Sequence, residues 1–519
     1  MKATEIQGVV AVGYIEGVNR EQTTYWALEE MVTEESMARV IDRYVDTSDL
    51  ERLGFTRTQP ASTGRPGYAP EPLVKLYIYG YQNTIRSSRK LEKECGRNLE
   101  VMWLTGGLTP DYKTISEFRR QNIRPLQKMF REFVKLCRSW ELVGGELFAV
   151  DGSKFKASNN KKNNFSRKKL EARLSRLDEK IDEYFARLDE EDRREDAETE
   201  VPEGLAKLIE RKELYEAYME HLNKTGETEI STVDPDARLM GNNRGGVEMA
   251  YNVQSTVDGK HHIIVDYDVS MNPSDQGQLS NMSKRLIRQG YRRFTVLADK
   301  GYYNGKCLQK GKKYKIKAIV SRQEPSDPKS QPKEYNTDKF RYDREADTYT
   351  CPAGAILNPH NKKTAKRRNY FNKTACGKCP HSDVCTSGER GYRTIVRSEY
   401  ADIYDEANQT FRENLELYKL RQQIVEHPFG TVKRTMDGGY FLLCKRRKVR
   451  CEIALLFLGY NLKRAVNVLG FKEIMARLDE RSRHFLRFFR LSRIFRAISQ
   501  SVYGNIPTRL FLPLLETAI

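Results

Sequence analysis

The sequence predicts an α/β fold in which a helical N-terminal region precedes a mixed domain of strands and helices. Three observations predict it. Apolar residues recur with helical spacing through much of the first 140 residues, and short apolar runs of strand length begin at Glu146. A helix-like segment, 276–289, then lies between two of these runs. Alternation of this kind fits a helix-covered sheet better than a barrel or a sandwich.

In the N-terminal region, 1–140, the segment 71–106 has helical apolar spacing on both sides of a short polar break. This predicts two helices joined by a turn, with Ser87 or Ser88 as the N-cap. The capping-box spacing of Thr114–Glu117 predicts a further helix from about 115 towards 137. Two interpretations stay open here, a plain helical bundle and a DNA-binding helix-turn-helix.

A second domain is expected at 141–470. Its first strand is the run ELFAVDGSKF, whose apolar part ends at Asp151. Further strands are expected at 247–255, 261–267 and 294–298, and the last of them is followed directly by Asp299. Carboxylates at strand ends, in a sheet with interspersed helices, are typical of an α/β nuclease-type core.

Two insertions are expected in this domain. In the first, 155–230, apolar residues alternate four and three apart from Leu170 to Leu188, a heptad seam that predicts an antiparallel helical hairpin. The hairpin is acidic, since 171–220 holds 18 acidic and 9 basic residues, and this disfavours a position on DNA. The second insertion, 324–395, is expected to be irregular around a group of cysteines.

Four of the nine cysteines have the spacing C-x24-C-x2-C-x5-C. They are Cys351, Cys376, Cys379 and Cys385. Thiolates at such spacing can surround a tetrahedral zinc ion, with His381 as an alternative fourth ligand. The other interpretation is four reduced cysteines without metal. A zinc ion here would be structural, because the insertion has little apolar material to hold it folded.

The composition describes a globular chain with surplus positive charge. The 519 residues suffice for three or four domains at about 150 residues each, and 39% of them are hydrophobic, which excludes fibrous and wholly disordered classes. Lys and Arg exceed Asp and Glu by 90 − 71 = 19, which favours a polyanionic partner, nucleic acid first. The sequence contains no apolar run long enough to span a membrane, and its first residues do not have the pattern of a secretory signal. We therefore expect a cytoplasmic protein without a membrane partner.

Three acidic residues from separate segments are the candidate catalytic groups: Asp151, Asp299 and Glu426. Carboxylates that hold two divalent ions can promote attack on a phosphodiester, because one ion activates the attacking oxygen and the other stabilises the leaving oxygen. Magnesium needs only a few protein oxygens. Taken singly, each residue could instead serve in a turn, a cap or an ion pair. The competing carboxylates are Asp266, Asp268 and Asp275, the last as a loop residue near the site.

The order of these acids, with the late segment Y-x2-R…E-x6-K, resembles the DDE insertion-sequence transposases. The signature residues here are Tyr418, Arg421, Glu426 and Lys433, and the resemblance extends from about Leu73 to Arg464. One feature departs from the family pattern. The usual Arg precedes the Glu by four residues, about 40° away on a helix, whereas Arg421 precedes Glu426 by five, about 140° away.

The resemblance implies a ribonuclease H-like catalytic core in which the three acids hold two Mg²⁺ or Mn²⁺ ions. The residues expected to contact DNA are Tyr418, Arg421, Lys433, Arg434 and Lys154. Lys154 opens a tract, 154–169, that contains seven basic residues and none that is acidic. A basic helical tail is expected at 471–519.

The activity implied by the resemblance is cleavage at insertion-sequence ends and strand transfer into target DNA. The expected partners are the terminal inverted repeats, the target duplex and a second copy of the chain in a synaptic complex. The expected location is the bacterial or archaeal cytoplasm, with the nucleoid. Two other functions stay open: a nuclease of the same fold that does not join strands, and a non-catalytic DNA-binding protein derived from a transposase.

Overall fold

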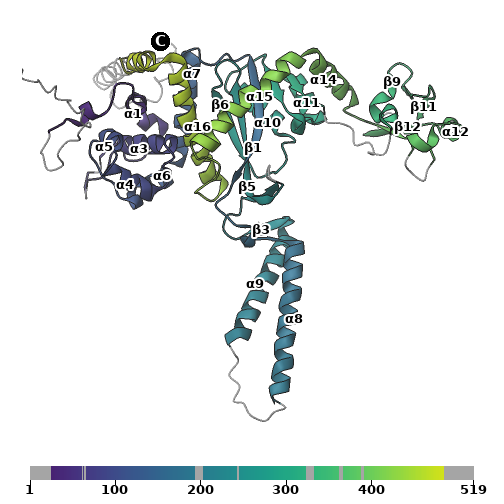
Figure 1. Ribbon diagram of the computed structural model, residues 1–519, viewed down its shortest axis with the longest axis horizontal. Coiled ribbons are helices and arrows are strands. Elements are labelled where there is room, and N and C mark those ends of the chain that lie inside the picture. Colours follow the sequence, from purple (N-terminus) through teal and green to yellow (C-terminus); the bar gives the residue numbers. More distant parts are fainter. Residues whose placement is uncertain are drawn as a thin grey trace, which may run out of the picture.

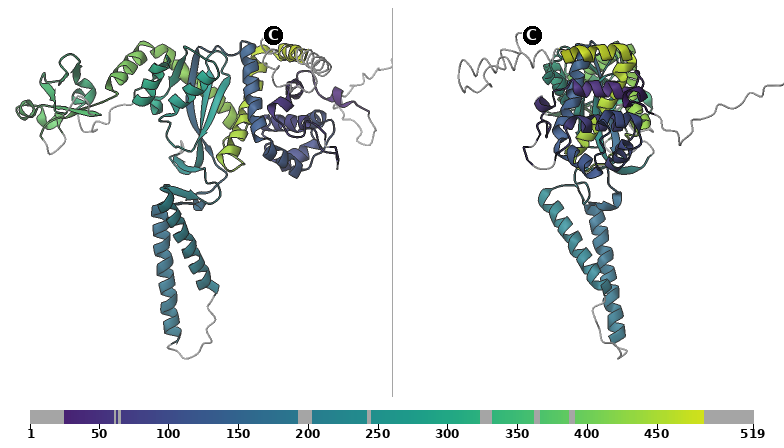
Figure 2. Two further views of the ribbon diagram at one scale, coloured as in Figure 1. Left: turned by 180° about the vertical axis from the view of Figure 1, so that it is seen from behind. Right: turned by 90° about the vertical axis from the view of Figure 1, so that its left-hand side faces the viewer.

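The computed structural model describes residues 25–60, 62–63, 66–192, 203–241, 245–322, 332–361, 366–386 and 391–483. It has a mixed α/β architecture, as predicted (Figure 1). Short helices at the N-terminal end lie beside a central sheet, a pair of long helices projects from that sheet, and a small second sheet lies on the opposite side from the N-terminal helices (Figures 1 and 2). Most of the basic tail predicted at 471–519 lies outside the described residues.

The N-terminal region consists of short helices. They are η1 Leu28–Met31, α1 Met37–Asp46, α2 Leu50–Leu53, α3 Pro70–Gln82, α4 Ser88–Cys95, α5 Leu99–Thr105, α6 Tyr112–Gln121 and α7 Ile123–Ser139. Two details differ from the sequence expectation. The helix expected from 115 to 137 is divided in two at Asn122, whose backbone leaves the helical region at φ −107° and ψ 27°. The N-cap of the first of these two helices, α6, is Asp111, whose carboxylate accepts a hydrogen bond from the Thr114 amide at 2.6 Å.

The central sheet combines antiparallel and parallel pairing. Its strands are β1 Leu147–Lys156, β4 Arg238–Gly241, β5 Val247–Asp258, β6 Ile264–Ser270, β7 Thr295–Ala298 and β8 Lys317–Val320. Strand β5 runs antiparallel to β1 on one edge and to β4 and β6 on the other. Strand β1 is parallel to β7, which is parallel to β8. The connections within the parallel part are α10 Gln278–Arg288, before β7, and α11 Gly305–Lys313, after it.

The late part of the chain returns to this sheet. Its elements are α14 Ala401–Glu413, α15 Leu415–Gly430, a π-helical turn η6 Thr431–Thr435, and α16 Arg446–Leu469. Helix α15 packs against β1, β5 and β7, and α16 packs against α3, α7 and β6. The backbone after η6 pairs with the end of β1, where Phe441 N donates to Lys156 O at 2.8 Å. Segments far apart in sequence are therefore held at β1.

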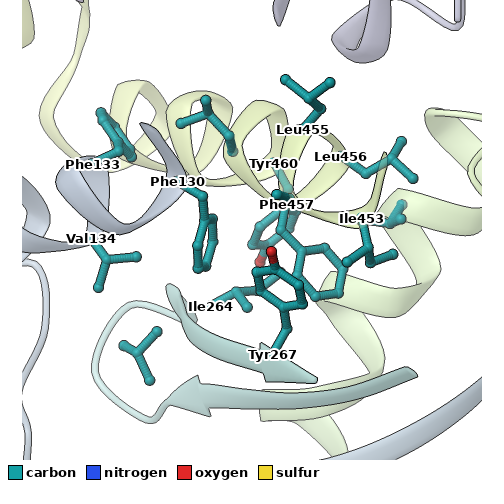
Figure 3. Close-up of a cluster of buried hydrophobic side chains, with 14 of the residues drawn as sticks. Phe130, Phe133, Val134, Ile264, Tyr267, Ile453, Leu455, Leu456, Phe457 and Tyr460 are labelled. Carbon is teal, nitrogen blue, oxygen red and sulfur yellow. The ribbon is translucent and has the colours of Figure 1, made fainter. Parts of the chain in front are cut away.

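A single hydrophobic core joins the N-terminal helices to the sheet. Figure 3 shows its centre, where rings from α7, β6 and α16 meet. The ring of Phe130 lies 5.2 Å from that of Tyr267, and Tyr267 lies 5.7 Å from Phe457, centroid to centroid, both pairs edge to face. Apolar α16 residues fill the space between the helical region and the sheet, so the two parts are packed as one body.

A buried ion pair lies next to this core. Glu452 of α16 is fully buried, and its carboxylate accepts hydrogen bonds from the amides of Leu442 and Leu443, each at 3.1 Å. The guanidinium of Arg86, also buried, lies 3.5 Å away and donates to the Tyr440 carbonyl at 2.7 Å. Burial raises the pKa of Glu452. These contacts fix the loop after η6 to both α16 and the N-terminal region.

Two insertions interrupt the central sheet. The first contains η2 Lys161–Asn163, β2 Asn164–Ser166, α8 Arg167–Asp192, α9 Glu203–Thr225 and β3 Glu229–Ser231, and its two long helices pack on each other. The second contains η4 Lys333–Tyr335, η5 Thr337–Lys339, β9 Arg341–Asp343, β10 Thr348–Thr350, β11 Ile356–Pro359, β12 Arg367–Phe371, α12 Lys373–Gly377, α13 Ser382–Cys385 and β13 Ile395–Ser398. The second insertion was expected to be irregular, but its strands form a five-stranded antiparallel sheet with its own small core.

Candidate active site

Asp151 lies in β1, and Asp299 directly follows the end of the neighbouring parallel strand β7. The parallel register pairs Ala149 of β1 with Leu297 of β7, so the aspartates two residues further on follow the last pair in both strands. Neighbouring strands are about 4.8 Å apart, and residues two apart share a face of the sheet. One sequence expectation is corrected here. Strand β1 does not end near Asp151 but continues to Lys156, because its pairing with β5 on the other edge continues.

The Asp151 carboxyl lies in an environment that disfavours its charge. Burial raises its pKa to about 7, the nearby Arg421 opposes that rise, and the carboxylates of Asp299 and Asp275 add to it. Arg421 Nη1 lies 3.9 Å from Asp151 Oδ1, so the guanidinium compensates the charge only in part. Asp299 accepts a hydrogen bond from the Gly301 amide at 2.9 Å, in the short 3-10 turn η3 Lys300–Tyr302. The site therefore holds negative charge that side chains do not fully balance.

Asp275 belongs to the same group of carboxylates. Its Oδ1 accepts hydrogen bonds from Asn252 Nδ2 and Gln254 Nε2 of β5, each at 2.7 Å. The Lys154 ammonium lies 3.8 Å from this oxygen. Gln254 in turn accepts a hydrogen bond from the Tyr302 hydroxyl at 2.5 Å. A chain of polar side chains thus joins β5, the loop that carries Asp275 and the turn after β7.

The sequence predictions did not include Asn252 or Gln254 in the site. A signal for both exists, because two buried polar residues two apart in the apolar strand VEMAYNVQS share a face of the sheet. The phenol of Tyr302 is fully buried, and burial together with the three neighbouring aspartates raises its pKa.

Arg421 and Lys433 of the late segment both approach β1, Arg421 at Asp151 and Lys433 at the residues that follow it. The Lys433 ammonium donates to Ser153 Oγ at 2.6 Å and to the Lys154 carbonyl at 2.7 Å. It also lies 4.6 Å from the centroid of the Phe155 ring. Burial lowers the pKa of Lys433 to about 8, against the opposing effect of Asp151. The lysine is thus fixed on β1 directly after the first aspartate.

The other residues predicted in this segment lie further out. The Tyr418 ring packs on Phe411, with 4.8 Å between centroids. The Arg421 guanidinium lies 5.9 Å from the centroid of the Tyr418 ring. Glu426 and Arg434 are exposed. Within the described residues, no hydrogen bond or ion pair joins Glu426 to either aspartate. On an ideal helix Glu426 lies about 140° from Arg421, which faces Asp151. The catalytic role of Glu426 therefore stays a prediction from the sequence motif.

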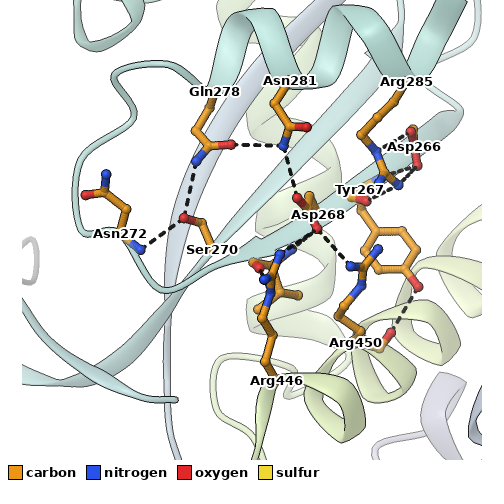
Figure 4. Close-up of polar contacts among 11 residues, drawn as sticks. Asp266, Tyr267, Asp268, Ser270, Asn272, Gln278, Asn281, Arg285, Arg446 and Arg450 are labelled. Atoms are coloured by element: carbon orange, nitrogen blue, oxygen red, sulfur yellow. Dashed lines mark hydrogen bonds and ion pairs between the residues drawn. The ribbon is translucent and has the colours of Figure 1, made fainter. Parts of the chain in front are cut away.

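Two competing carboxylates have structural partners instead (Figure 4). Arg285 of α10 donates to both carboxylate oxygens of Asp266, at 2.7 and 2.6 Å. Asp268 accepts a hydrogen bond from Asn281 and forms ion pairs with Arg446 at 3.5 Å and with Arg450 at 3.3 Å. These pairs tie β6 to α10 and α16.

The four clustered cysteines line one cavity of about 30 Å³ in the second insertion: Cys351, Cys376, Cys379 and Cys385. The Ala355 amide donates to Cys351 Sγ at 3.2 Å. Burial raises the pKa of the Cys385 thiol, and the other three cysteines add to that rise. The ring of His381, the alternative ligand, packs 5.6 Å from that of Tyr335.

Two negative findings apply to the described part of the chain only. There, no three His, Cys, Asp or Glu side chains are already arranged closely enough to hold one metal ion. Among the same residues, no helix is both long and apolar enough to cross a membrane.

Comparison with known proteins gives two family matches. Residues 26–121 match a transposase domain model, DUF772, and residues 350–466 match a model described as a transposase DDE domain. The second match contains Tyr418, Arg421, Glu426 and Lys433, whereas Asp151 and Asp299 lie outside both. No curated protein matches the chain.

Among solved structures, one match is a cryo-EM structure of a piggyBac transposase synaptic complex with hairpin DNA. The two sequences are 9% identical, and the alignment covers 91% of this chain and 83% of that chain. Its TM-score of 0.25 gives no support to a common fold.

Proposed function

The chain belongs to the DDE-family transposases, and from this premise we propose that it cuts DNA at the ends of an insertion sequence and joins them to target DNA. In the first step water attacks the phosphodiester at the element end and releases a 3′ hydroxyl. In the second step this hydroxyl attacks a phosphodiester of the target, and the target's own 3′ oxygen leaves. The family supports a DNA-processing enzyme, and the carboxylate site supports the specific chemistry proposed here.

The observation that carries the proposal is that Asp151 of β1 and Asp299, directly after β7, both lie two residues beyond the last pair of these parallel strands. Burial, with a smaller contribution from Asp299 and Asp275, raises the pKa of Asp151, and a bound cation would favour its ionised form. Transposases of this family generally use divalent metal ions. Carboxylate oxygens are the ligands that Mg²⁺ and Mn²⁺ prefer, so the site fits such an ion in kind. Asp151, Asp299 and Glu426 would hold two of them, and bound ions would activate the attacking and leaving oxygens.

Basic side chains near Asp151 are suited to position a phosphate. Two of the three N–H bonds of Lys433 are used on Ser153 and the Lys154 carbonyl, which leaves one that can reach a DNA oxygen. Arg421 holds its guanidinium beside Asp151, where it can balance charge on the scissile phosphate. Lys154, Arg434 and Tyr418 would contact the flanking strand.

The same proposal covers the architecture. We assign the central sheet, with carboxylates on adjacent parallel strands and an acid-bearing helix α15 across it, to a ribonuclease H-like core at 141–470 with the two insertions. The helices of 1–140 would recognise terminal inverted repeats, and two copies would pair the ends. On the basis of the family, we propose that the protein is located in the cytoplasm of a bacterial or archaeal cell.

We also propose a structural zinc ion in the second insertion. The four thiols line one cavity, and an amide donates to Cys351 Sγ, a contact that stabilises a thiolate. Zinc content measured by mass spectrometry should be one ion per chain and should fall in a Cys379→Ser variant. The zinc site would be contradicted if the purified wild-type chain contained no zinc and the insertion melted at the same temperature in wild type and in Cys379→Ser.

The test of the function uses purified protein, DNA that carries the element end, and Mg²⁺. Asp151→Asn, Asp299→Asn and Glu426→Gln should each abolish nicking at the 3′ end while DNA binding persists. Asp437→Asn serves as the control, because Asp437 is exposed and its left-handed backbone, φ 47°, suits asparagine. Cleavage by all three variants would refute the proposal. Cleavage without joining would identify the nuclease, and a wild-type chain that binds DNA but never cuts it would identify the non-catalytic protein.

A further inference from the structure

Three lysines form one outer face of α11, the helix that follows β7 and the turn η3. Lys306, Lys310 and Lys313, called the lysine row below, lie within about 60° of one another on an ideal helix and extend over about 10 Å of its axis. Lys306 and Lys313 are exposed and Lys310 is half-buried, whereas Cys307 and Leu308, on the other side of the helix, are buried. The lysine row therefore presents three positive charges to solvent along one line.

The protein does not neutralise the lysine row. Within the part of the chain that the structure describes, none of the three ammonium groups forms an ion pair. Other lysines of the segment 300–323, which has eight basic residues and no acidic one, do have partners. Lys312, about 100° or more around the helix from the row, donates to both carboxylate oxygens of Glu406 in α14, at 2.8 and 2.7 Å. Lys317 donates to Asn414 Oδ1 at 2.9 Å. The charges of the row are thus left for an external anion.

The lysine row lies on the far side of the candidate active site from the N-terminal helices. Helices α7 and α16 pack on β6 at one edge of the central sheet, and α11 packs on β8 at the other, with β1 and β7 between them (Figure 1). Asp299 directly follows β7, and α11 begins six residues later, at Gly305. DNA that runs from the N-terminal helices past Asp151 and Asp299 would therefore reach α11 next.

We propose that the lysine row binds backbone phosphates of the DNA beyond the cut, on the side away from the recognised repeat. The inference rests on the proposed function, because it requires DNA whose scissile phosphate lies at the carboxylates. Nucleotides of one strand follow each other at about 3.4 Å along the duplex axis, so a row of about 10 Å spans about three of them. Phosphate contacts carry no sequence information, which suits flanking DNA that differs from one insertion site to the next.

The experiment measures binding of the full chain to two duplexes by fluorescence anisotropy in EDTA, at several salt concentrations. One duplex carries the element end with its flanking DNA, and the other stops at the nick that the wild-type protein makes. The triple variant Lys306→Gln, Lys310→Gln, Lys313→Gln should bind the flanked duplex about tenfold or more weakly than wild type. Its slope of log affinity against log salt concentration should be smaller by about 3, because three phosphate contacts are lost. Both proteins should bind the shorter duplex equally.

A matched control removes the same charge from three lysines that are ion-paired with carboxylates: Lys212→Gln, Lys224→Gln and Lys312→Gln together. This control should bind both duplexes like wild type. The inference would be overturned, and the proposed function left intact, by unchanged binding of the row variant to the flanked duplex. An equal loss on both duplexes, or an equal loss in the control, would overturn it in the same way. A wild-type chain that never nicks the element end would overturn the proposed function and this inference with it.

A second measurement uses wild-type protein, so it decides the matter even if the triple variant does not fold. Lysines are acetylated with and without each duplex, and the extent at each position is read by mass spectrometry. The flanked duplex should protect the lysine row and leave Lys224, in the projecting helix α9, as reactive as before. Equal reactivity of the row with and without that duplex would overturn the inference. Protection that follows protein concentration without DNA would also overturn it, because the partner of the row would then be a second copy of the chain.

Discussion

Replacement of Asp151 by asparagine is expected to stabilise the protein at pH 8 in the absence of divalent cations. The reason is the cost of ionising this carboxyl in the folded chain, where burial and two neighbouring aspartates outweigh Arg421 and raise its pKa to about 7. Asparagine has nearly the same shape but no charge to bury. Asp151→Asn, a substitution at a proposed catalytic residue, should thus increase the free energy of unfolding.

The magnitude follows from the pKa difference between folded and unfolded chains. The ordinary value is 3.8, so the shift is about 3 units, each about 1.4 kcal/mol. Below pH 4 the carboxyl is protonated in both states and contributes nothing. Between pH 4 and 7 only the unfolded chain ionises, so wild-type stability falls relative to the variant, and above pH 7 the difference is constant. Because the side chain is 23% exposed, screening by water reduces the upper limit of about 4 kcal/mol, and we expect about 2 to 4.

The assay is thermal unfolding of wild type, Asp151→Asn and Asp437→Asn in EDTA at pH 5 and pH 8. At about 2–4 °C per kcal/mol for a domain of this size, the variant should melt several degrees above wild type at pH 8 and much closer to it at pH 5. Added Mg²⁺ should stabilise wild type and not the variant. A difference that does not change with pH, or a less stable variant at pH 8, would refute the account of Asp151.

Three further outcomes are expected. Glu452→Ala should lower the free energy of unfolding in urea by about 3–5 kcal/mol, because it leaves a buried guanidinium unpaired, and a loss below 1 kcal/mol would contradict the buried pair. Gly152→Ala should reduce the rate of DNA nicking at least tenfold, since its methyl group displaces the acidic cluster, whereas Gly241→Ala, with open space around it, should nick at the wild-type rate. Arg434→Ala should lower the slope of log affinity for DNA against log salt concentration by about 1, and an unchanged slope would show that this arginine does not contact phosphate.

Local patterns predicted much of the fold. The α/β class followed from the change in apolar spacing at Glu146 and is confirmed, as is the resemblance to DDE transposases. The expected strand at 261–267 is instead β6 Ile264–Ser270, because strand limits depend on pairing with β5, which a local pattern does not contain. The helix break at Asn122 was missed, since the apolar spacing continues across it.

The candidate site was less accessible from sequence. Asp151 and Asp299 stand out because each follows an apolar strand, and Glu426 comes from the family motif alone. Asp275 appeared only as a loop residue near the site. Its contacts with Asn252 and Gln254 depend on tertiary structure, which brings the loop after β6 over the middle of β5.

The aromatic contacts among α7, β6 and α16 have a consequence for fragments of this enzyme. Since the first helices and the strands share one apolar interior, a fragment that begins at Glu146 would expose the inner side of α16 to water and self-associate. Heating should accordingly melt both parts in one cooperative transition. Under the proposed function, in which the first helices bind the terminal repeat and the carboxylates cut the DNA, the fixed position of the two parts would set the distance between the repeat and the cut.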